Sequence, residues 1–333
     1  MAAWLPQFFL FTMGLALTLY VILDGYDLGI GLLLPLAEES EKDAMIASIG
    51  PFWDANETWI VLGIGILLMA FPHAHGIVLS ELYLPVTLML IGLILRGVAF
   101  DFRAKVVLSR KALWNRLFFL GSLVTAISQG WMVGRYVTGL QQSLVISLFS
   151  CLIALTMPAL YILLGVAWLL IKSSGRLYDK AMRWGRRAVL PMGLSLLSIS
   201  LATPLVSESI AAKWYTLPDS LVLLPIPLTC VLAYGIMLWL LFRPQSDHDG
   251  RIQPGVLLFM ILALLCLMAT VGLAYSLFPD IILGQMTIYE AAAAEASLRF
   301  VFIGTVITVP MILVYTTVVY RLFGGELSSL DYE

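Results

Sequence analysis

Two short stretches bracket the part of the chain on which the rest of the fold depends. Residues 50–59 read GPFWDANETW, and residues 95–103 read LRGVAFDFR. Between them lie two long apolar runs, joined by FPHAHG at residues 71–76, which we expect to be a short turn. Both stretches carry charged side chains at the same ends of the two predicted helices. Ionisable groups inside apolar helices are costly, so each one is a candidate functional residue.

The composition is that of a protein embedded in a membrane. The chain has 333 residues, of which 61% are hydrophobic and 12% are charged, whereas soluble domains carry about 25% charged residues. The formal net charge is -2, and basic residues cluster only in the connecting loops, which gives no indication of nucleic-acid binding. No Walker, Rossmann or zinc motif is present in the sequence. We therefore expect an all-α polytopic membrane protein, with residues 1–333 forming a single integral membrane domain.

Nine apolar segments are long enough to cross a membrane as helices, which takes about 20 residues each. They cover residues 8–36, 51–71, 77–100, 115–136, 144–171, 188–206, 219–242, 255–277 and 298–322. No Lys or Arg precedes Lys42, so we expect the first segment to be retained as a helix and not cleaved as a signal peptide. In the longest outer loop, the run 289–295 is a candidate amphipathic surface helix, and Pro310 is expected to kink the last helix.

The distribution of Lys and Arg predicts the orientation, because cytoplasmic loops carry an excess of both. With the N-terminus outside, only Arg135, Lys213 and Arg299 face the outside, and Arg96 stays in the membrane. The cytoplasmic side then receives Lys42, Arg103, Lys105, Arg110, Lys111, Arg116, Lys172, Arg176, Lys180, Arg183, Arg186, Arg187, Arg243, Arg251 and Arg321. We therefore expect a periplasmic N-terminus and, after nine transmembrane helices, a cytoplasmic C-terminus.

Six ionisable side chains are expected to gather in the cytoplasmic half of the first three helices. A rise of about 1.5 Å per residue puts them at similar depth. Within each of the first two helices, two acids are three residues apart and so share a face. The six residues are Asp24, Asp27, Asp54, Glu57, Arg96 and Asp101.

Small, polar and aromatic residues accompany these charges. Gly25 and Gly29 form a small-xxx-small pair that allows another helix to approach closely. Trp53 and Trp59 flank the second acidic pair, and with Asn56 they are expected to pack the helices or to wall the site.

The cluster has a structural and a functional interpretation. In the structural one, Arg96 pairs with one carboxylate, and Asp54 and Asp101 favour helix ends. In the functional one, an acidic surplus around one deep Arg leaves a group that can carry a proton, on a polar path from the cytoplasm to the middle of the membrane. Because the structural interpretation does not explain four acids around one Arg, the sequence favours the functional one.

Other candidate ligands are weaker. His73 and His75 are expected in the solvated outer turn, and no His lies within a predicted span, so a haem in this chain would lack its usual ligand. Cys151, Cys230 and Cys266 fall in apolar runs without paired spacing, which is typical of small core residues. We predict no metal site in this chain.

Three motifs together carry a family resemblance. LDGYDLGIG at residues 23–31, WDANETW at 53–59 and RGVAFDFR at 96–103 resemble subunit II of the cytochrome bd-type ubiquinol oxidases in order, spacing and helix position. The nine-helix layout extends the resemblance over most of the chain. The pair Asn56-Glu57 resembles the branch that includes the cyanide-insensitive oxidases, whereas the better-known branch carries Gln at the second position.

The resemblance implies a subunit of a quinol oxidase complex in the bacterial inner membrane, which oxidises quinol, reduces oxygen to water and is electrogenic. The partner, subunit I, carries two b-type haems, a d-type or substitute haem, and the quinol site. Subunit II carries no haem, is not catalytic alone, and has a fold of two four-helix bundles plus one further helix. Some members hold a quinone in subunit II as a structural ligand, and a small single-helix subunit and membrane lipids are further candidate partners.

The resemblance also implies roles for the charged residues. Subunit II stabilises subunit I, and its acids are proposed to bring cytoplasmic protons toward the oxygen-reducing haem. Here Arg96 would balance the charge of the proton pathway formed by Asp24, Asp27, Asp54, Glu57 and Asp101.

Two other functions stay open from the residues themselves. One is a proton-coupled secondary transporter, and the other is a haem-stabilising scaffold whose buried ions only pack. Transporters commonly show broken helices in two repeated halves, whereas the charges here occupy only the N-terminal third of the chain. That distribution favours the oxidase subunit over the transporter.

Overall fold

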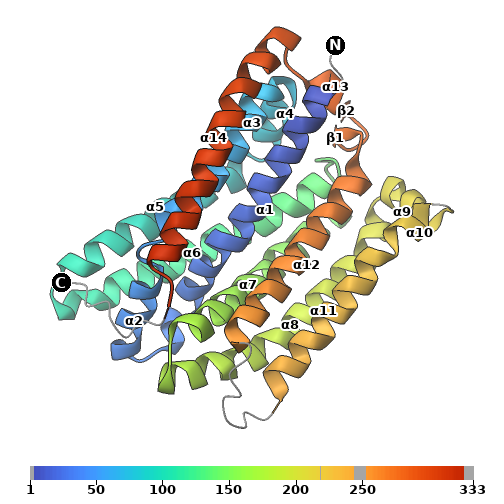
Figure 1. Cartoon of the computed structure of the whole chain (residues 1–333). Coiled ribbons are helices and arrows are strands. Elements are labelled where there is room, and N and C mark those ends of the chain that lie inside the picture. The colour runs from blue at the N-terminus through green and yellow to red at the C-terminus, as the bar shows by residue number, and fades with distance from the viewer. Residues whose placement is uncertain (1–3, 218, 244–252, 326–333) are drawn as a thin grey trace.

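Long apolar helices, most of them running in nearly the same direction or its reverse, make up the chain (Figure 1). The computed structural model describes residues 4–217, 219–243 and 253–325. Within these ranges the elements are α1 (Trp4–Leu33), the 3-10 turn η1 (Leu34–Leu36), α2 (Glu39–Ile49), α3 (Trp53–Ala70), α4 (Pro72–Glu81), α5 (Tyr83–Lys105), α6 (Leu108–Val137), α7 (Leu144–Lys172), α8 (Gly175–Val206), α9 (Glu208–Tyr215), α10 (Asp219–Leu223), α11 (Pro225–Phe242), α12 (Pro254–Leu277), β1 (Asp280–Ile282), β2 (Met286–Thr287), α13 (Ile288–Ala291) and α14 (Glu295–Leu322).

Eight helices in the described part of the chain are individually long and apolar enough to cross a membrane. A ninth candidate exists only if α2 and α3, which are bent by 51° relative to each other, are taken as one span. Large apolar side chains also cover the outer surface: Leu205 is 86% exposed and Phe300 is 79% exposed. Such a surface suits lipid, and the prediction of an all-α polytopic membrane protein is confirmed.

The bend between α2 and α3 follows from the local sequence. Pro51 has no N–H to donate, so the hydrogen-bonding pattern of α2 cannot continue through it. α2 is itself a polar helix whose start is closed by a capping box between Glu38 and Glu41. Lys180 of α8 binds both of these carboxylates, at 2.7 Å and 2.8 Å. These ion pairs hold α2 against α8, and the helix axis changes direction where α3 begins.

Residues 72–81 form α4 where the sequence analysis expects a turn over residues 71–76. Pro72 occupies the start of this helix, where its missing N–H has no partner to lose. Ala74 and Val78, four residues apart, are the buried side chains of α4 and hold one face of it against the core. As a consequence, α5 begins at Tyr83 and not at residue 77.

A small hairpin precedes the last helix. β1 and β2 are antiparallel, with Asp280 opposite Thr287. Of the surface helix expected over residues 289–295, only residues 289–291 are helical before α14 starts, as part of α13 (Ile288–Ala291). The backbone N–H and the hydroxyl of Thr287 bind Glu290 in a capping box, and these hydrogen bonds lower the pKa of that carboxyl.

α1 is the central helix and packs against α3, α6 and α7 (Figure 1). It crosses α7 backbone to backbone at Gly29 and Gly165. A Cβ on Gly29 would lie 1.8 Å from the carbonyl oxygen of Tyr161, and a Cβ on Gly165 would lie 2.7 Å from the carbonyl carbon of Gly29. Gly25, one turn earlier, faces the side chains of Tyr161 and Leu164. This crossing brings α1 close enough to its neighbours to close off the middle of the bundle.

The Gly29 crossing generates a stability prediction with a control on the same helix. Gly29→Ala should lower the free energy of unfolding by about 1–3 kcal/mol or more, because the added methyl has to displace the backbone of α7. Gly14→Ala should be nearly neutral, since nothing lies within 4 Å of that position. Thermal unfolding of the two purified variants in detergent provides the comparison, and equal midpoints would contradict the close crossing.

Candidate functional site

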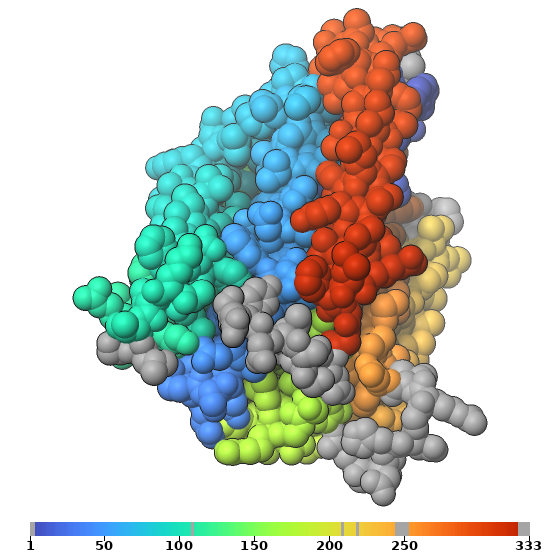
Figure 2. Space-filling model, turned by 60° about the vertical axis from the view of Figure 1, so that its left-hand side comes forward, coloured from blue at the N-terminus to red at the C-terminus, as the bar shows by residue number. Residues whose placement is uncertain are grey.

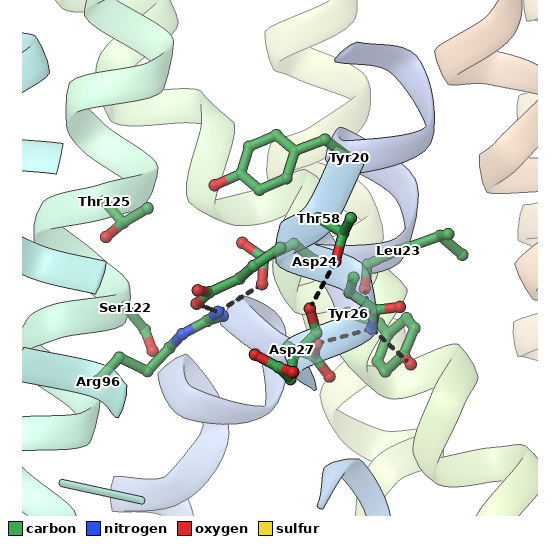
Figure 3. A network of polar contacts seen from close by, with 12 residues as sticks. Tyr20, Leu23, Asp24, Tyr26, Asp27, Thr58, Arg96, Ser122 and Thr125 are labelled. Atoms are coloured by element: carbon green, nitrogen blue, oxygen red, sulfur yellow. Dashed lines mark hydrogen bonds and ion pairs between the residues drawn. The ribbon is translucent and has the colours of Figure 1, made fainter. Parts of the chain in front are cut away.

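Four of the six predicted charged residues meet inside the helix bundle. α1 contributes Asp24 and Asp27, α3 contributes Glu57, and α5 contributes Arg96, which extends toward α1 (Figure 3). The Nη2 of Arg96 lies 2.5 Å from the Oδ1 of Asp24 and also forms an ion pair with the Oε1 of Glu57. One guanidinium nitrogen therefore bridges carboxylates from two helices. We call these four residues the acid cluster.

The acid cluster is almost completely shielded from the surface. Asp24 and Asp27 are 0% exposed and Arg96 is 1% exposed. The side chain of Glu57 is 27% exposed, so it alone connects the cluster to the surface of the chain. The spacing of three residues in α1 explains how both aspartates point inward.

Negative charge exceeds positive charge in this buried space. Three carboxylates surround Arg96, which makes no ion pair with Asp27. The Oδ2 of Asp24, the Oδ1 of Asp27 and the Nη1 of Arg96 are all buried and have no hydrogen-bond partner among the described residues. Burying a charge is costly unless it is paired and hydrogen-bonded. A proton shared among the carboxylates would remove part of that cost, and the unpartnered oxygens are places where it can sit.

Asn56 of α3 links the cluster to two tyrosines. Its Nδ2 donates to the Oδ2 of Asp27 at 2.8 Å and to the hydroxyl of Tyr26 at 2.8 Å. The hydroxyl of Tyr320, from α14, donates to the Oδ1 of Asn56 at 3.0 Å and lies 2.7 Å from the hydroxyl of Tyr26. Asn56 therefore contacts the acid cluster directly and is one of its polar neighbours.

A second group of polar side chains lies beside the cluster on the α6 side. Gln129 donates from its Nε2 to the hydroxyl of Tyr20 at 2.7 Å and accepts a hydrogen bond from Tyr161 at its Oε1. Ser122 and Thr125, also on α6, are buried at the same side (Figure 3). The sequence analysis missed this group, although Ser122, Thr125 and Gln129 follow a helical spacing of three and four residues that marks one face of an apolar helix.

The two other predicted acids lie outside the cluster. Asp54 and Asp101 are both exposed, and neither side chain forms a hydrogen bond or ion pair with the residues the structure describes. Asp54 is in the first turn of α3, but the helix has no side-chain cap. On α5 the buried face carries Arg96, Ala99 and Arg103, and Asp101 projects away from it. The structure thus places Asp54 and Asp101 on the surface of the chain, near the cluster in sequence but not in contact with it.

The two tryptophans occupy different environments. Trp59 is buried, and its Nε1 has no hydrogen-bond partner among the described residues. Trp53 is half-buried, and its ring lies 5.3 Å from that of Phe100 on α5. Trp53 and Phe100 also line a narrow crevice that borders Arg96, together with Ile49 and Phe118, and it has no room for a water molecule. Trp53 therefore forms part of the wall between Arg96 and the surface.

Other candidate ligands lie elsewhere. His73 is exposed and His75 half-buried on α4, beyond the opposite end of α3. Glu81, at the end of α4, lies 3.5 Å from Arg135 of α6 and belongs to a separate ion pair. Within the described ranges no three His, Cys, Asp or Glu side chains are grouped so that they could hold a metal ion. Cys151, Cys230 and Cys266 are free thiols, the last of them buried.

The fold and the site together define a polytopic membrane protein that encloses an arginine-bridged acid cluster between its helices. A family profile described as cytochrome bd terminal oxidase subunit II matches residues 5–323. The chain therefore belongs to the cytochrome bd terminal oxidase subunit II family, and as a member it is a subunit of an oxidase complex.

Individual relatives agree with this assignment. The chain is 26% identical over 317 residues to cytochrome bd ubiquinol oxidase subunit 2 of Bacillus subtilis (strain 168), covering 88% of each chain. It is 25% identical to cytochrome bd-I ubiquinol oxidase subunit 2 of Escherichia coli (strain K12), covering 96% of this chain and 94% of the relative. A chain in the structure of bd oxidase from Geobacillus thermodenitrificans shares the fold, with a TM-score of 0.74, 18% identity, and coverage of 96% and 98%.

The arginine bridge generates a prediction about assembly. Arg96→Leu leaves the carboxylates of Asp24 and Glu57 without their counter-charge, which typically costs about 3–5 kcal/mol for a buried pair. The amount of folded protein in membranes and its thermal midpoint should both fall. Adding Asp24→Asn to Arg96→Leu removes one stranded charge and should recover part of the loss. A double variant no better than the single one would contradict the pairing.

Proposed function

We propose that this chain is the haem-free subunit II of a bd-type quinol oxidase in the bacterial inner membrane. The complex would oxidise quinol and reduce oxygen to water, and this chain would stabilise the haem-bearing subunit I and conduct protons to it. The family match over residues 5–323 and the names of the Bacillus and Escherichia relatives support the oxidase. The acid cluster is the observation that carries the proton conduction, since oxygen reduction consumes protons at a buried haem.

The orientation is part of this proposal. The ends of the helices near α2 carry most of the Lys and Arg, including Arg103, Lys172 and Lys180. The opposite end, with α4 and α9, carries Arg135 and Lys213. By the positive-inside rule, the α2 side would face the cytoplasm. Asp54 and Glu57, at the start of α3, would then lie nearest the cytoplasm, where the protons originate.

The proposed route begins at the surface of the chain. Asp54 and Asp101 are exposed acids at the cytoplasmic ends of α3 and α5 and would collect protons there. Glu57, partly exposed and bridged by Arg96 to Asp24, would pass them inward. Asp27 lies beyond the bridge, without a cationic partner of its own. Its free Oδ1 would accept the proton before transfer toward the partner subunit.

Haem belongs to the partner in this proposal. The described histidines, His73 and His75, lie on α4, away from the acid cluster. Haem iron in proteins is typically held by His, Met, Cys or Tyr ligands in a shielded pocket. The contribution of this chain would be to supply protons, not to bind the redox centre.

A haem-stabilising scaffold is the second candidate function, and one observation favours it. Arg96 ties α1, α3 and α5 together through Asp24 and Glu57, which is also what a purely structural ion pair would do. The surplus of carboxylates favours proton conduction, because Asp27 takes no part in the arginine bridge. The secondary transporter is disfavoured by the family match, which extends over nearly the whole chain.

The proposed orientation is tested with reporter fusions. A reporter fused after Ser174, between α7 and α8, should be cytoplasmic, and one fused after Thr216, between α9 and α10, should be periplasmic. Alkaline phosphatase activity and fluorescence of a cytoplasm-specific reporter distinguish the two sides. Opposite signals at both positions would reverse the depth argument for the whole cluster.

The proton role is tested by neutral substitutions that keep the side-chain shape. Glu57→Gln in the complete oxidase should lower oxygen consumption per haem by about tenfold or more, because a positioned proton carrier is removed. Asp54→Asn should have a smaller effect, since water can replace an exposed donor. Haem content and subunit assembly should stay normal in both variants.

Glu81→Gln provides the matched control for this experiment. Glu81 is also partly exposed and paired with an arginine, but it lies at the other end of the molecule. Substituting it should leave the turnover of the oxidase unchanged. Near-normal turnover in Glu57→Gln would reject it as a carrier. A parallel loss of haem and activity would favour the scaffold.

A further inference from the structure

Tyr320 lies in the last turn of α14, a helix that has few other buried side chains. α14 packs mainly against α3 and to a smaller extent against α1, and Figure 2 shows it along one edge of the molecule. Its buried side chains are Leu298, Thr305 and Val319. The hydroxyl of Tyr320 nevertheless reaches Asn56 and Tyr26, which adjoin the acid cluster. A peripheral helix therefore supplies a polar group to the centre of the site.

Tyr320, Asn56 and Tyr26 form a closed ring of hydrogen bonds. The bonds are 3.0 Å from Tyr320 to the Oδ1 of Asn56, 2.8 Å from the Nδ2 of Asn56 to Tyr26, and 2.7 Å between the two tyrosine hydroxyls. An amide oxygen can only accept, and each hydroxyl has one proton. Tyr320 must therefore donate to Asn56, Tyr26 must donate to Tyr320, and Asn56 must donate to Tyr26.

This donor count fixes which side of the Asn56 amide faces the cluster. With its oxygen held by Tyr320, Asn56 presents its NH₂ group toward the Oδ2 of Asp27, at 2.8 Å. An N–H donor suits a carboxylate and has nothing to offer the O–H of a carboxylic acid. The Nδ2 also donates to the carbonyl oxygen of Leu23, at 3.2 Å, so turning the amide costs that longer bond. Without Tyr320 the amide oxygen has no donor, and turning it toward a neutral Asp27 supplies one.

The end of α14 is held in place by an unusual cation. Lys172, at the end of α7, is buried, and its Nζ donates to the carbonyl oxygen of Phe323, the residue that follows α14. Its ammonium lies 5.0 Å from the centre of the Phe52 ring and 5.2 Å from that of Trp168. The ring of Tyr320 packs against the same two rings, at 4.8 Å and 5.9 Å. A cation is favourable at a helix C-terminus, and here it anchors the turn that carries Tyr320.

We propose that Tyr320 is a positioning residue for proton transfer, which acts through Asn56 to keep Asp27 in its ionised, proton-accepting form. This inference rests on the proposed proton-conducting function. The Tyr320 ring is held in position by Lys172, Phe52 and Trp168. The last helix therefore influences the protonation of Asp27, although it does not contact that carboxylate. The groups facing Asp27 are Asp24 and Tyr26 of α1, Asn56 and Glu57 of α3, Arg96 of α5 and, through the ring, Tyr320 of α14.

The test compares Tyr320→Phe with Tyr315→Phe in the complete oxidase. Tyr315 lies on the same helix, is 50% exposed and makes no hydrogen bond with the described residues, so its variant should behave like the wild type. Tyr320→Phe should keep its haem content and its KM for quinol. Its turnover at neutral pH should fall about tenfold, the effect of losing the hydrogen bond from Asn56 to the charged Asp27. Raising the pH should restore turnover, because it removes the proton that the turned amide stabilises on Asp27.

Infrared spectroscopy gives a second readout that a structural role would not move. At neutral pH, Tyr320→Phe should show a carbonyl band of a protonated carboxylic acid that the wild type lacks, and this additional band should be missing from Tyr320→Phe combined with Asp27→Asn. Wild-type turnover in Tyr320→Phe, a loss that no pH restores, or loss of haem would each overturn the inference. The underlying proton function is tested separately by Asp27→Asn alone. Full turnover in that variant rejects the function, whereas slow turnover there with a normal Tyr320→Phe rejects only the positioning role.

Discussion

The ion pairs of Arg96 are the constraint on which the rest of the structure depends. A charged side chain at the centre of a bilayer costs about 3 kcal/mol on insertion scales, so Arg96 needs partners at its own depth. Asp24 and Glu57 supply them from α1 and α3. The pairing sets the register of three helices at once, because a shift of either acid by one turn, about 5.4 Å, would break the contact. Everything else in the cluster is arranged around that bridge.

Close helix crossings make such a bridge effective by keeping water away from it. α1 meets α7 at Gly29 and Gly165, and α5 meets α6 where a Cβ on Gly121 would lie 2.6 Å from the carbonyl oxygen of Gly92. The second crossing lies one turn from Arg96, whose backbone nitrogen would be 2.9 Å from the same added atom. The glycine crossing therefore fixes the backbone of Arg96 against α6, and the two acids fix the position of its guanidinium group. The low polarity that results strengthens each charge interaction and also makes the unpaired carboxylate oxygens costly, which suits a group that exchanges a proton.

Much of this arrangement could be predicted from the sequence, and the failures have identifiable causes. The meeting of Asp24, Asp27, Glu57 and Arg96 could be predicted, because these residues interrupt long apolar runs at countable distances from the helix ends. The direction in which each side chain points around its helix was not predicted. Asp101 follows Arg96 by five residues, which at 3.6 residues per turn puts it about 140° away around the helix axis, and it is exposed in the structure. The tyrosines and Gln129 could not be placed, because Tyr320 is 264 residues from Asn56 and no local pattern records that contact. Helix α4 was missed because Pro72 was interpreted as part of a turn, although proline is equally at home in the first turn of a helix.

The most direct test of the account is proton uptake during a single turnover. The complete oxidase, reduced and bound to carbon monoxide, would be exposed to oxygen and flashed with light, while a pH-sensitive dye reports protons taken from the solution and absorbance reports the haems. If the acid cluster carries protons, Asp27→Asn should slow proton uptake by about tenfold or more and leave the first electron-transfer step at the haems unchanged. Uptake at the wild-type rate in that variant would contradict the account and leave the cluster with a structural role alone.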